Sequence, residues 1–445
     1  MIKGIENFGK LFLERTEKKS IQIISNFNSD GITSAAIFGR LLKKIDRNFG
    51  FTLVQSLEKE LLESLPKTKV LVFLNLGSMN LTELEKLEND IFIIDKHEIE
   101  KYQNLSSNIQ ILNPRIEENP EGLSTSCITY ILSREIAKKD AKSANLAIVG
   151  LVEDISDKQM GPIAHSILND ADITIKRGLL LYPSTRPLNR TLEYSSNPYI
   201  PGVTGNYNGV VALLKEAKIP FSETGYKSLI DLTEEEMQKL ISATATRLPD
   251  PNKMHEFIGN LYLIKNTGTV DDAREISALI NACSKMGDAN IALLLCMGNN
   301  TMKKRAEQIY IQYKQNLIEA LNNANANPKI QGNSYVILNA KDKIQDTIIG
   351  TVASIVSMSA LYKEGTVIIA MAYNQDKIKI SSRISGRDKV DSSLNLREFM
   401  NQVTELIGGE SKGHKFEASC IINKDKEEAF IELVKKKLEF ETIKI

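Results

Sequence analysis

The sequence predicts an α/β protein with several domains, and three observations lead to this fold class. A chain of 445 residues is long for one hydrophobic core, so two or three domains are expected. Apolar strand-like runs alternate with helical segments through the first half, which is typical of a parallel sheet with helices on both faces. Strands and helices return near the end of the chain. We expect domains at residues 1–190, 191–330 (a linker and a mostly helical middle region) and 331–445 (a second α/β domain).

The first half of the chain alternates strands with helices in a regular order. The apolar, β-branched run SIQIISNF predicts a buried strand, and the helical spacing of the next fifteen residues predicts a helix with one polar face. Two more buried strands are expected, each ending in polar residues, with short helices between them and a capped helix and a mostly apolar segment after them. These elements lie at residues 20–27, 31–45, 68–78, 81–89, 90–98, 122–139 and 144–157.

The residue composition of the sequence changes from residue 176. Prolines, glycines and arginines between 176 and 206 predict loops, and the following region to residue 330 is expected to be mostly helical. The run NANANPKIQGN (323–333) is typical of a linker. Beyond it, strands are expected at 335–340, 366–373 and 377–383, then a helix at 395–407, a glycine-containing segment at 408–422 and a lysine-rich terminal helix.

Composition excludes several classes of protein. Lys plus Arg and Asp plus Glu number 56 each, so no overall charge draws the chain to nucleic acid, and any such contact needs a local basic patch. The four cysteines are scattered without a CxxC pair, which argues against a zinc ribbon or a disulfide scaffold and predicts core positions. Because no apolar run approaches the length of a membrane span, we expect a cytoplasmic protein without a membrane partner.

Polar residues gather where the first three predicted strands end. Asn26, Asn28 and Asp30 follow the first strand, Asn75 follows the second, and the tripeptide from Asp95 to His97 follows the third. In parallel sheets, ligands bind beyond the carboxyl ends of the strands, so these side chains are expected to converge. A simpler alternative for the first group is an Asn/Asp turn that caps the following helix.

Several segments, in the same order along the chain, resemble the DHH phosphoesterase superfamily, and specifically the archaeal RecJ-like nucleases of the GINS-associated type. SNFNSDG resembles the first family motif, usually H-x-D-x-D-G, and NLG the second, usually D-x-G. IIDKHE resembles the D-H-H signature, and IVGLVEDISDK the fourth motif. KISSR and GGESKGHKFEAS resemble the accessory DHHA1 domain. The resemblance implies an N-terminal DHH domain with a parallel sheet and a C-terminal α/β DHHA1 domain.

The resemblance also implies a site for two manganese-like ions that activate water against a phosphodiester. In this sequence Asn26 and Lys96 stand where the family has histidine, and Asn28 and Asn75 where it has aspartate. Asp30 and Asp154 match the family, as do Asp95, which orients the strand end, and His97, which usually faces substrate phosphate. Two dications need anionic ligands, so the loss of carboxylates predicts a degenerate site with no catalytic residue set intact and no metal. The remnant positions are Asn26, Asn28, Asp30, Asn75, Asp95, Lys96, His97 and Asp154.

Lys96 is expected to occupy the place of the second ion. A protonated ammonium has no lone pair for a metal, and it attracts a carboxylate 4 Å away by roughly 4 kcal/mol at an effective dielectric near 20, before desolvation. Its amine is therefore expected within hydrogen-bonding distance of Asp30 or Asp154. The alternative is that amide ligands and a movable Lys96 still permit weak hydrolysis with Mn²⁺ or Mg²⁺, held by Asp30 and Asp154.

The C-terminal segments imply contact with phosphate or single-stranded nucleic acid. Glycines let backbone N–H groups approach an anion, and lysines add positive charge, although Glu417 removes some. A flexible surface turn and a plain strand edge are the simpler alternatives. The residues implied are Ser381, Ser382, Arg383, Gly408, Gly409, Lys412, Gly413 and His414.

Three functions are compatible with these expectations. The first is a non-catalytic RecJ-like protein that binds single-stranded DNA or acts as a scaffold in replication or repair, with GINS or MCM among its partners. The second is a manganese-dependent 5′-to-3′ exonuclease or phosphoesterase. The third is a silent regulatory subunit of an active RecJ-like paralogue. Because the changes at the ligand positions spare the folding residues around them, such as Gly31 and Gly77, we favour the first.

Overall fold

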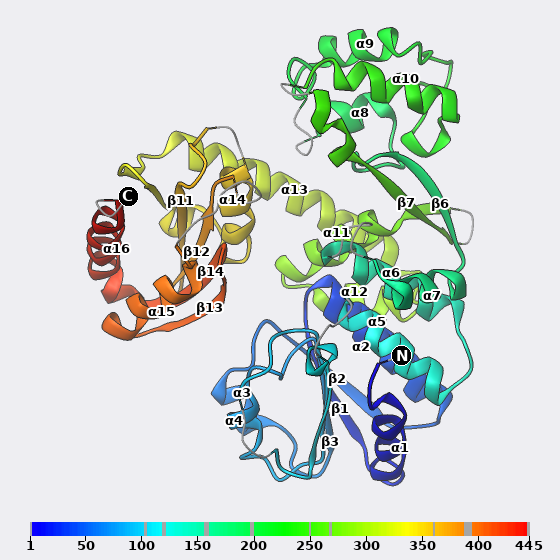
Figure 1. The fold of residues 1–445 in the computed structure, drawn as a ribbon, viewed down its shortest axis with the longest axis vertical. Coiled ribbons are helices and arrows are strands. Elements are labelled where there is room, and N and C mark those ends of the chain that lie inside the picture. Colours follow the sequence, from blue (N-terminus) through cyan, green and yellow to red (C-terminus); the bar gives the residue numbers. More distant parts are fainter. Residues whose placement is uncertain are drawn as a thin grey trace. The chain divides into compact units, whose positions relative to one another are not determined.

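A computed structural model of the chain describes residues 2–101, 105–117, 122–154, 160–195, 200–248, 251–266, 269–358, 361–386 and 394–442 (Figure 1). Its contacts divide the chain into two compact units, Met1–Glu307 and Gln308–Ile445, and each is described by itself below. The three-domain division with boundaries after 190 and 330 stays a prediction.

The first unit is built on a five-stranded parallel sheet. Its strands are β1 (Ile21–Asn26), β2 (Phe49–Val54), β3 (Val70–Leu74), β4 (Ile91–Ile94) and β5 (Ile109–Leu112). The spatial order is β2-β1-β3-β4-β5, so the order reverses between β1 and β3. In such sheets this reversal opens a crevice at the carboxyl ends of the two strands, which is where ligands bind. The three predicted strands are confirmed, and β2 and β5 are additional.

Helices cover both faces of this sheet, as the fold class predicts. They are α1 (Ile5–Arg15), α2 (Ser29–Lys44), α3 (Lys59–Ser64), α4 (Leu81–Leu84), α5 (Thr125–Ile136), α6 (Ala141–Asp154) and α7 (Pro162–Asp170). Figure 1 shows α3 and α4 on one side of β1 and β3, and α1 and α2 on the other. On the α1 side, Phe12 packs edge-on against Phe38 and Phe92, and on the α3 side leucines such as Leu62 and Leu84 join the core of the sheet.

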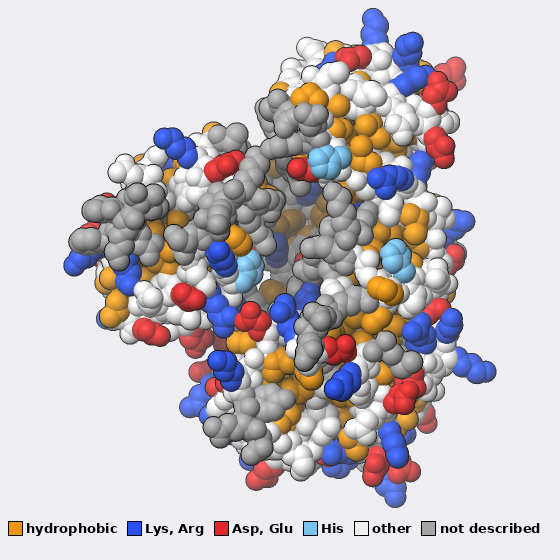
Figure 2. All heavy atoms as spheres, in the orientation of Figure 1, with side chains coloured by type: hydrophobic (Ala, Val, Ile, Leu, Met, Phe, Trp, Pro, Cys, Tyr) orange, Lys and Arg blue, Asp and Glu red, His pale blue; other side chains and the backbone are white. Residues whose placement is uncertain are grey.

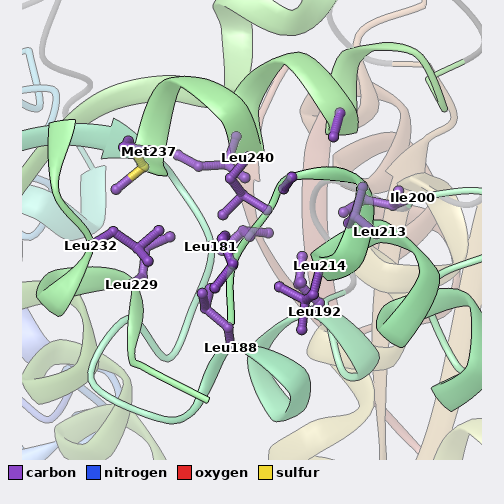
Figure 3. Packing of buried hydrophobic residues seen from close by; sticks show 14 of the residues in the cluster. Leu181, Leu188, Leu192, Ile200, Leu213, Leu214, Leu229, Leu232, Met237 and Leu240 are labelled. Atoms are coloured by element: carbon purple, nitrogen blue, oxygen red, sulfur yellow. The ribbon is translucent and has the colours of Figure 1, made fainter. Parts of the chain in front are cut away.

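The second part of the first unit combines a small sheet with helices. The antiparallel sheet has the order β6-β7-β8, formed by β6 (Ile173–Leu179), β7 (Ile258–Asn266) and β8 (Thr269–Asp272). The helices are α8 (Leu188–Glu193), α9 (Tyr207–Glu216), α10 (Glu234–Ala245), α11 (Ala273–Lys285) and α12 (Ala289–Cys296). Figure 3 shows leucines of α8, α9 and α10 pointing toward one another in a shared core. The loop predicted from residue 176 is wrong over β6, because pairing with β7 forms a strand there.

The second unit is a mixed sheet with helices. Its elements, with α13 entering from the first unit, are α13 (Met302–Ala326), β9 (Ile330–Gln331), β10 (Tyr335–Asn339), α14 (Asp346–Met358), β11 (Val367–Asn374), β12 (Lys377–Ile384), α15 (Leu396–Ile407), β13 (Glu410–His414), β14 (Glu417–Asn423) and α16 (Glu427–Thr442). The strand order is β13-β14-β12-β11-β10-β9, with β10 and β11 parallel. The predicted linker at 323–333 is wrong at both ends, because α13 continues to Ala326 and β9 pairs with β10.

Short 3₁₀ turns complete the described structure, at Pro114–Ile116, Leu229–Asp231, Pro251–Phe257, Lys341–Lys343 and Lys424–Lys426. All four cysteines are buried with free thiols, which confirms their predicted core positions. Figure 2 shows lysine, arginine, aspartate and glutamate interspersed over the visible face, as the balanced composition predicts. Within the described ranges, every helix is too short or too polar to cross a bilayer.

Candidate functional site

The polar residues predicted at the strand ends do come together at the crevice between β1 and β3. Asn26 is the last residue of β1, Asn75 follows β3, and Lys96 lies two residues beyond β4. Helix α5 points its N-terminus at the same place, because Thr125 and Ser126 both donate to the Asp30 carboxylate. A side-chain network therefore joins elements that are about a hundred residues apart in sequence.

The turn between β1 and α2 forms as an Asn-capped helix start. The Asn26 side-chain oxygen accepts from the backbone N–H of Asn28 at 3.0 Å, and the Asn28 side-chain oxygen accepts from Gly31 at 2.8 Å. These bonds satisfy N–H groups that a helix start leaves without partners. Gly31 is needed here, because a Cβ at this position would lie 2.0 Å from the Asn26 carbonyl oxygen. The alternative of an Asn/Asp turn that caps the following helix is thus correct for this turn, which is also part of a larger hydrogen-bond network.

Asp30 is the centre of this network. It is fully buried, and its Oδ1 accepts from the Ser126 N–H at 2.8 Å while its Oδ2 accepts from the Thr125 N–H at 3.0 Å. The Lys96 Nζ lies 2.9 Å from the same Oδ2, with the lysine side chain only 18% exposed. The expected contact between Lys96 and Asp30 is confirmed. The side chain of Asp154, the other predicted partner, lies outside the described residues.

Two asparagine amides occupy the positions next to this ion pair. The Asn75 Nδ2 donates to the Asn28 Oδ1 at 2.9 Å, and the Thr125 hydroxyl donates to the Asn75 Oδ1 at 2.9 Å. Asn75 is buried and has a φ of 58°, the left-handed conformation that asparagine tolerates better than most residues. The amide oxygens at both positions therefore already accept hydrogen bonds from the protein.

His97 and Asp95 form a second pair beside the first. The Asp95 Oδ1 lies 2.7 Å from the His97 Nδ1 and accepts from the Lys96 N–H at 2.8 Å, and its Oδ2 accepts from the Ser78 N–H at 3.2 Å. The following loop is held by Asn113, whose amide donates to the His97 carbonyl at 2.9 Å. Asp95 thus orients the strand end, and the structure gives His97 the carboxylate partner expected of a structural histidine.

Opposing effects set the pKa values of this pair. Burial alone raises the pKa of Asp95, but the hydrogen bond and charge of His97, together with backbone N–H groups, outweigh it and lower the pKa below its usual 3.8. Burial alone lowers the pKa of His97, but the hydrogen bond and charge of Asp95 outweigh it and raise the pKa above 6.5. The imidazole therefore carries positive charge at a higher pH than a free histidine.

This shift predicts a pH-dependent contribution to stability. A raised folded-state pKa means that His97 stabilises the fold fully below 6.5, its usual value, and that this contribution is lost as the pH rises through the higher folded-state pKa. Because the His97 side chain is 49% exposed, we expect less than about 1 kcal/mol. The difference in unfolding free energy between the wild type and His97→Gln should be larger near pH 5.5 than near pH 8.5. If the wild type and His97→Gln differ in unfolding free energy by the same amount at both pH values, this prediction is wrong.

Helix α11 closes the site from the second part of the unit. The Asn281 side chain accepts from the Ser29 N–H at 2.9 Å and donates to Glu153 at 2.7 Å, and the Ser284 hydroxyl donates to the Phe27 carbonyl. Cys127 lies nearby in α5, where burial raises the pKa of its thiol to about 12, so it is no nucleophile. Sequence reasoning missed the roles of Thr125, Ser126, Asn281 and Ser284.

The C-terminal candidate residues lie around strands β12 to β14. Ser381 and Ser382 are buried, and the Arg383 side chain is 11% exposed. The arginine binds Glu417 at 2.5 Å, the Ser354 hydroxyl at 3.0 Å and the Ser382 carbonyl at 2.8 Å. Its charge is therefore used inside the unit, and the prediction that Arg383 presents itself to a phosphate is not supported by this geometry.

The remaining residues of this group are exposed. Lys412 and His414 lie on β13, the edge strand, in register with Ser419 and Glu417 of β14. Gly408, Gly409 and Gly413 have positive φ values of 81°, 149° and 147°. A Cβ on Gly413 would lie 2.2 Å from the Glu417 carbonyl oxygen, so this glycine permits the tight hairpin. The structure thus separates the group into a buried strand and an exposed edge.

Comparison with known families covers most of the chain. Residues 20–151 match the DHH family N-terminal domain, residues 181–261 the DHH-CID domain, and residues 332–439 the DHHA1 domain. The chain belongs to the DHH family. An uncharacterized protein of Methanocaldococcus jannaschii is 27% identical to this chain, with 97% of each chain covered.

Two solved structures share this DHH fold. The exonuclease RecJ bound to manganese matches 97% of this chain and 93% of its own, with 15% identity and a TM-score of 0.60. CDC45 from Entamoeba histolytica matches 96% of both chains, with 14% identity and a TM-score of 0.65. At these identities the likeness extends to the fold alone.

The donor groups that the structure describes at this site, which do not include the Asp154 side chain, do not fit a pair of dications. Hard divalent ions need several oxygen ligands, mostly anionic. Asp30 offers oxygens that already accept two backbone N–H groups and an ammonium, and the amide oxygens of Asn28 and Asn75 accept hydrogen bonds from Gly31, Asn75 and Thr125. Among the described residues, no group of three or more His, Cys, Asp or Glu side chains is placed to hold a metal.

Proposed function

We propose that this chain is a non-catalytic RecJ-like DHH protein that acts in DNA replication or repair, as a single-stranded-DNA-binding or scaffold factor. One observation carries the proposal: at Asp30, a carboxylate at a metal-ligand position of the family already binds the Lys96 ammonium and accepts from the Thr125 and Ser126 N–H groups. A metal at Asp30 would have to compete with this ammonium, whose positive charge lies 2.9 Å from Oδ2. The site therefore keeps the architecture of a phosphoesterase without its chemistry.

A scaffold role is supported by what this site retains. The buried polar groups of the site form hydrogen bonds with one another and with α5 and α11, so they contribute packing and rigidity instead of ligand binding. CDC45 shares the fold over nearly its whole length. By analogy, we propose that this chain binds a replication protein such as GINS or MCM. The manganese-bound exonuclease RecJ supplies the competing function, a metal-dependent nuclease.

The wild-type protein should show no manganese-dependent hydrolysis of 5′-labelled single-stranded DNA, and Mn²⁺ should not raise its melting temperature. An ion that bound only the folded state at 100 times its Kd would add about 2.7 kcal/mol of stability. The control is His97→Gln, because the exposed half of that side chain leaves the core intact. Manganese-dependent hydrolysis that co-elutes with the chain would overturn the proposal, and its loss in His97→Gln would place the activity at this site.

DNA binding is expected to depend on the exposed edge of the second unit. Lys412→Ala should weaken binding of a single-stranded oligonucleotide several-fold, whatever its sequence, and should reduce the slope of log K against log salt by about 0.7, because one phosphate contact is lost. Fluorescence anisotropy across a salt series measures both. Lys436→Ala, which removes another exposed lysine from α16, is the matched control and should change neither.

The same titration separates the scaffold from a regulatory subunit. Wild-type protein that binds no oligonucleotide at low salt would exclude the single-stranded-DNA-binding form of the proposal. Co-purification with an active RecJ-like nuclease whose rate it changes would then identify a silent regulatory subunit.

A further inference from the structure

The second part of the first unit carries an exposed apolar hollow that the proposed function does not use. The hollow measures about 390 Å³, at the lower end of the roughly 300–1,000 Å³ of ligand pockets. It is lined by Val211, Lys215, Lys218, Ile219, Pro220, Phe221 and Tyr226. Where Figure 1 labels α9 and α10, Figure 2 shows hydrophobic side chains at the surface between charged ones.

Two aromatic rings are held rigidly at the edge of this hollow. Ser222 and Gly225 exchange two backbone hydrogen bonds, of 3.1 and 2.9 Å, which close a tight turn between Phe221 and Tyr226. The two rings pack edge to face, with their centroids 5.0 Å apart. Phe221 is nevertheless 68% exposed. A rigid, exposed aromatic ring loses little conformational entropy on binding, which is typical of the residues that dominate protein interfaces.

The charged side chains around the hollow differ in sign and in whether they form ion pairs. Lys215 and Lys218 form no side-chain ion pair or hydrogen bond with the described residues. The neighbouring Glu216 is paired with Arg247 at 2.6 Å, and Glu235 with Lys239 at 2.5 Å. Glu223, in the turn, does not line the hollow. The apolar floor is therefore bordered by two lysines and by no carboxylate, and the charge of Lys218 also acts on Glu235 of the neighbouring hollow.

We propose that this hollow docks an acidic peptide segment of a partner protein, with an aromatic or aliphatic side chain inserted beside Phe221 and carboxylates facing Lys215 and Lys218. The surface lies outside the degenerate site, so the inference stands whether or not that site is catalytic. It goes beyond the proposed function by giving the partner's chemistry and its place of contact.

Single-stranded nucleic acid is the competing occupant, since bases stack on aromatic rings and phosphates bind lysines. Two features favour the peptide. The edge-to-face packing of Phe221 on Tyr226 provides a cleft instead of two parallel stacking faces. The hollow is lined by five apolar or aromatic residues and only two lysines, whereas single-stranded nucleic acid is bound in a positively charged groove that follows its backbone.

The test is selection from a displayed library of random peptides on the full-length chain, with counter-selection against a Phe221→Ala chain. Enriched peptides should carry aspartates and glutamates around an aromatic or aliphatic residue. No enrichment, or enrichment of basic peptides, would overturn the proposal.

The strongest selected peptide then gives a quantitative test by fluorescence anisotropy. Phe221→Ala and, separately, the pair Lys215→Glu and Lys218→Glu should each weaken its binding at least about tenfold. Tyr207→Ala is the matched control, because Tyr207 is an exposed aromatic in the same region that does not line the hollow. Equal weakening by Tyr207→Ala would place the peptide elsewhere. Displacement of the peptide by a single-stranded oligonucleotide, in a manner lost with Phe221→Ala, would assign the surface to nucleic acid.

Discussion

Replacing Asp30 with alanine is expected to lower the free energy of unfolding by about 3–5 kcal/mol, the range found when one partner of a buried ion pair is removed. The change takes the Asp30 carboxylate away from the Lys96 ammonium, which is only 18% exposed. It also removes the acceptor from the Thr125 and Ser126 N–H groups at the start of α5. Buried donors without partners add to the cost. Denaturant unfolding, followed by circular dichroism, measures the loss.

A surface ion pair supplies the matched control for this change. Glu235→Ala removes the partner of Lys239 one helical turn away and should cost far less than Asp30→Ala, because the Glu235 side chain is exposed. Adding Lys96→Met to Asp30→Ala should recover part of the lost stability, because the positive charge that faced Asp30 is then removed as well. A cost for Asp30→Ala as small as that of Glu235→Ala would show that the buried pair is not the centre of the site.

The second large effect is a gain of metal binding. We expect the triple variant Asn28→Asp, Asn75→Asp, Lys96→His to bind Mn²⁺, because, among the described side chains, it places three carboxylates and an imidazole where the wild type has the Asp30 carboxylate, two amides and an ammonium. Without metal, the carboxylates repel one another, so the variant should be less stable than the wild type. Saturation at 100 times the Kd should then raise its stability by about 2.7 kcal/mol. Melting with Mn²⁺, and reversal by a chelator, measures the gain.

The role of the lysine is isolated by a partial reversion. The double variant Asn28→Asp, Asn75→Asp keeps Lys96, and its ammonium should still hold the place of a cation beside Asp30. It should therefore respond to Mn²⁺ much less than the triple variant. An equal response would show that the missing carboxylates alone keep metal out, and that Lys96 has no part in excluding it.

The elements predicted correctly are those with strong local patterns. β3 and β4 are uninterrupted apolar runs, β1 is a buried, isoleucine-rich run, and α2 and α5 combine helical periodicity with Asn28 and Ser124 as caps. β5 spans only four residues, and its pattern does not distinguish it from a loop. β6 contains the Lys176-Arg177-Gly178 run, which is a strand only because β7, some eighty residues later, supplies its hydrogen bonds. Long-range pairing overrides local composition there.

Part of the site could be predicted because the strands that carry it could be predicted. The carboxyl ends of parallel strands meet at one edge, so the convergence of Asp30, Asn75 and Lys96 follows from their positions after β1, β3 and β4. The donors from Thr125 and Ser126 are backbone N–H groups, and these leave no trace in a sequence. The contact of Asn281 depends on the docking of α11, which local patterns do not encode. The inward use of Arg383 depends likewise on Glu417 standing opposite it in the sheet.

The counter-ion of Asp30 is part of the polypeptide itself. A metal cofactor has a dissociation constant, so a domain built around one becomes weaker whenever the free ion is scarce or a chelator competes for it. Lys96 is covalently attached and cannot be diluted away. If the site is non-catalytic as proposed, we expect the strand ends of β1 and β3 to present the same surface to their surroundings under metal starvation as under metal excess.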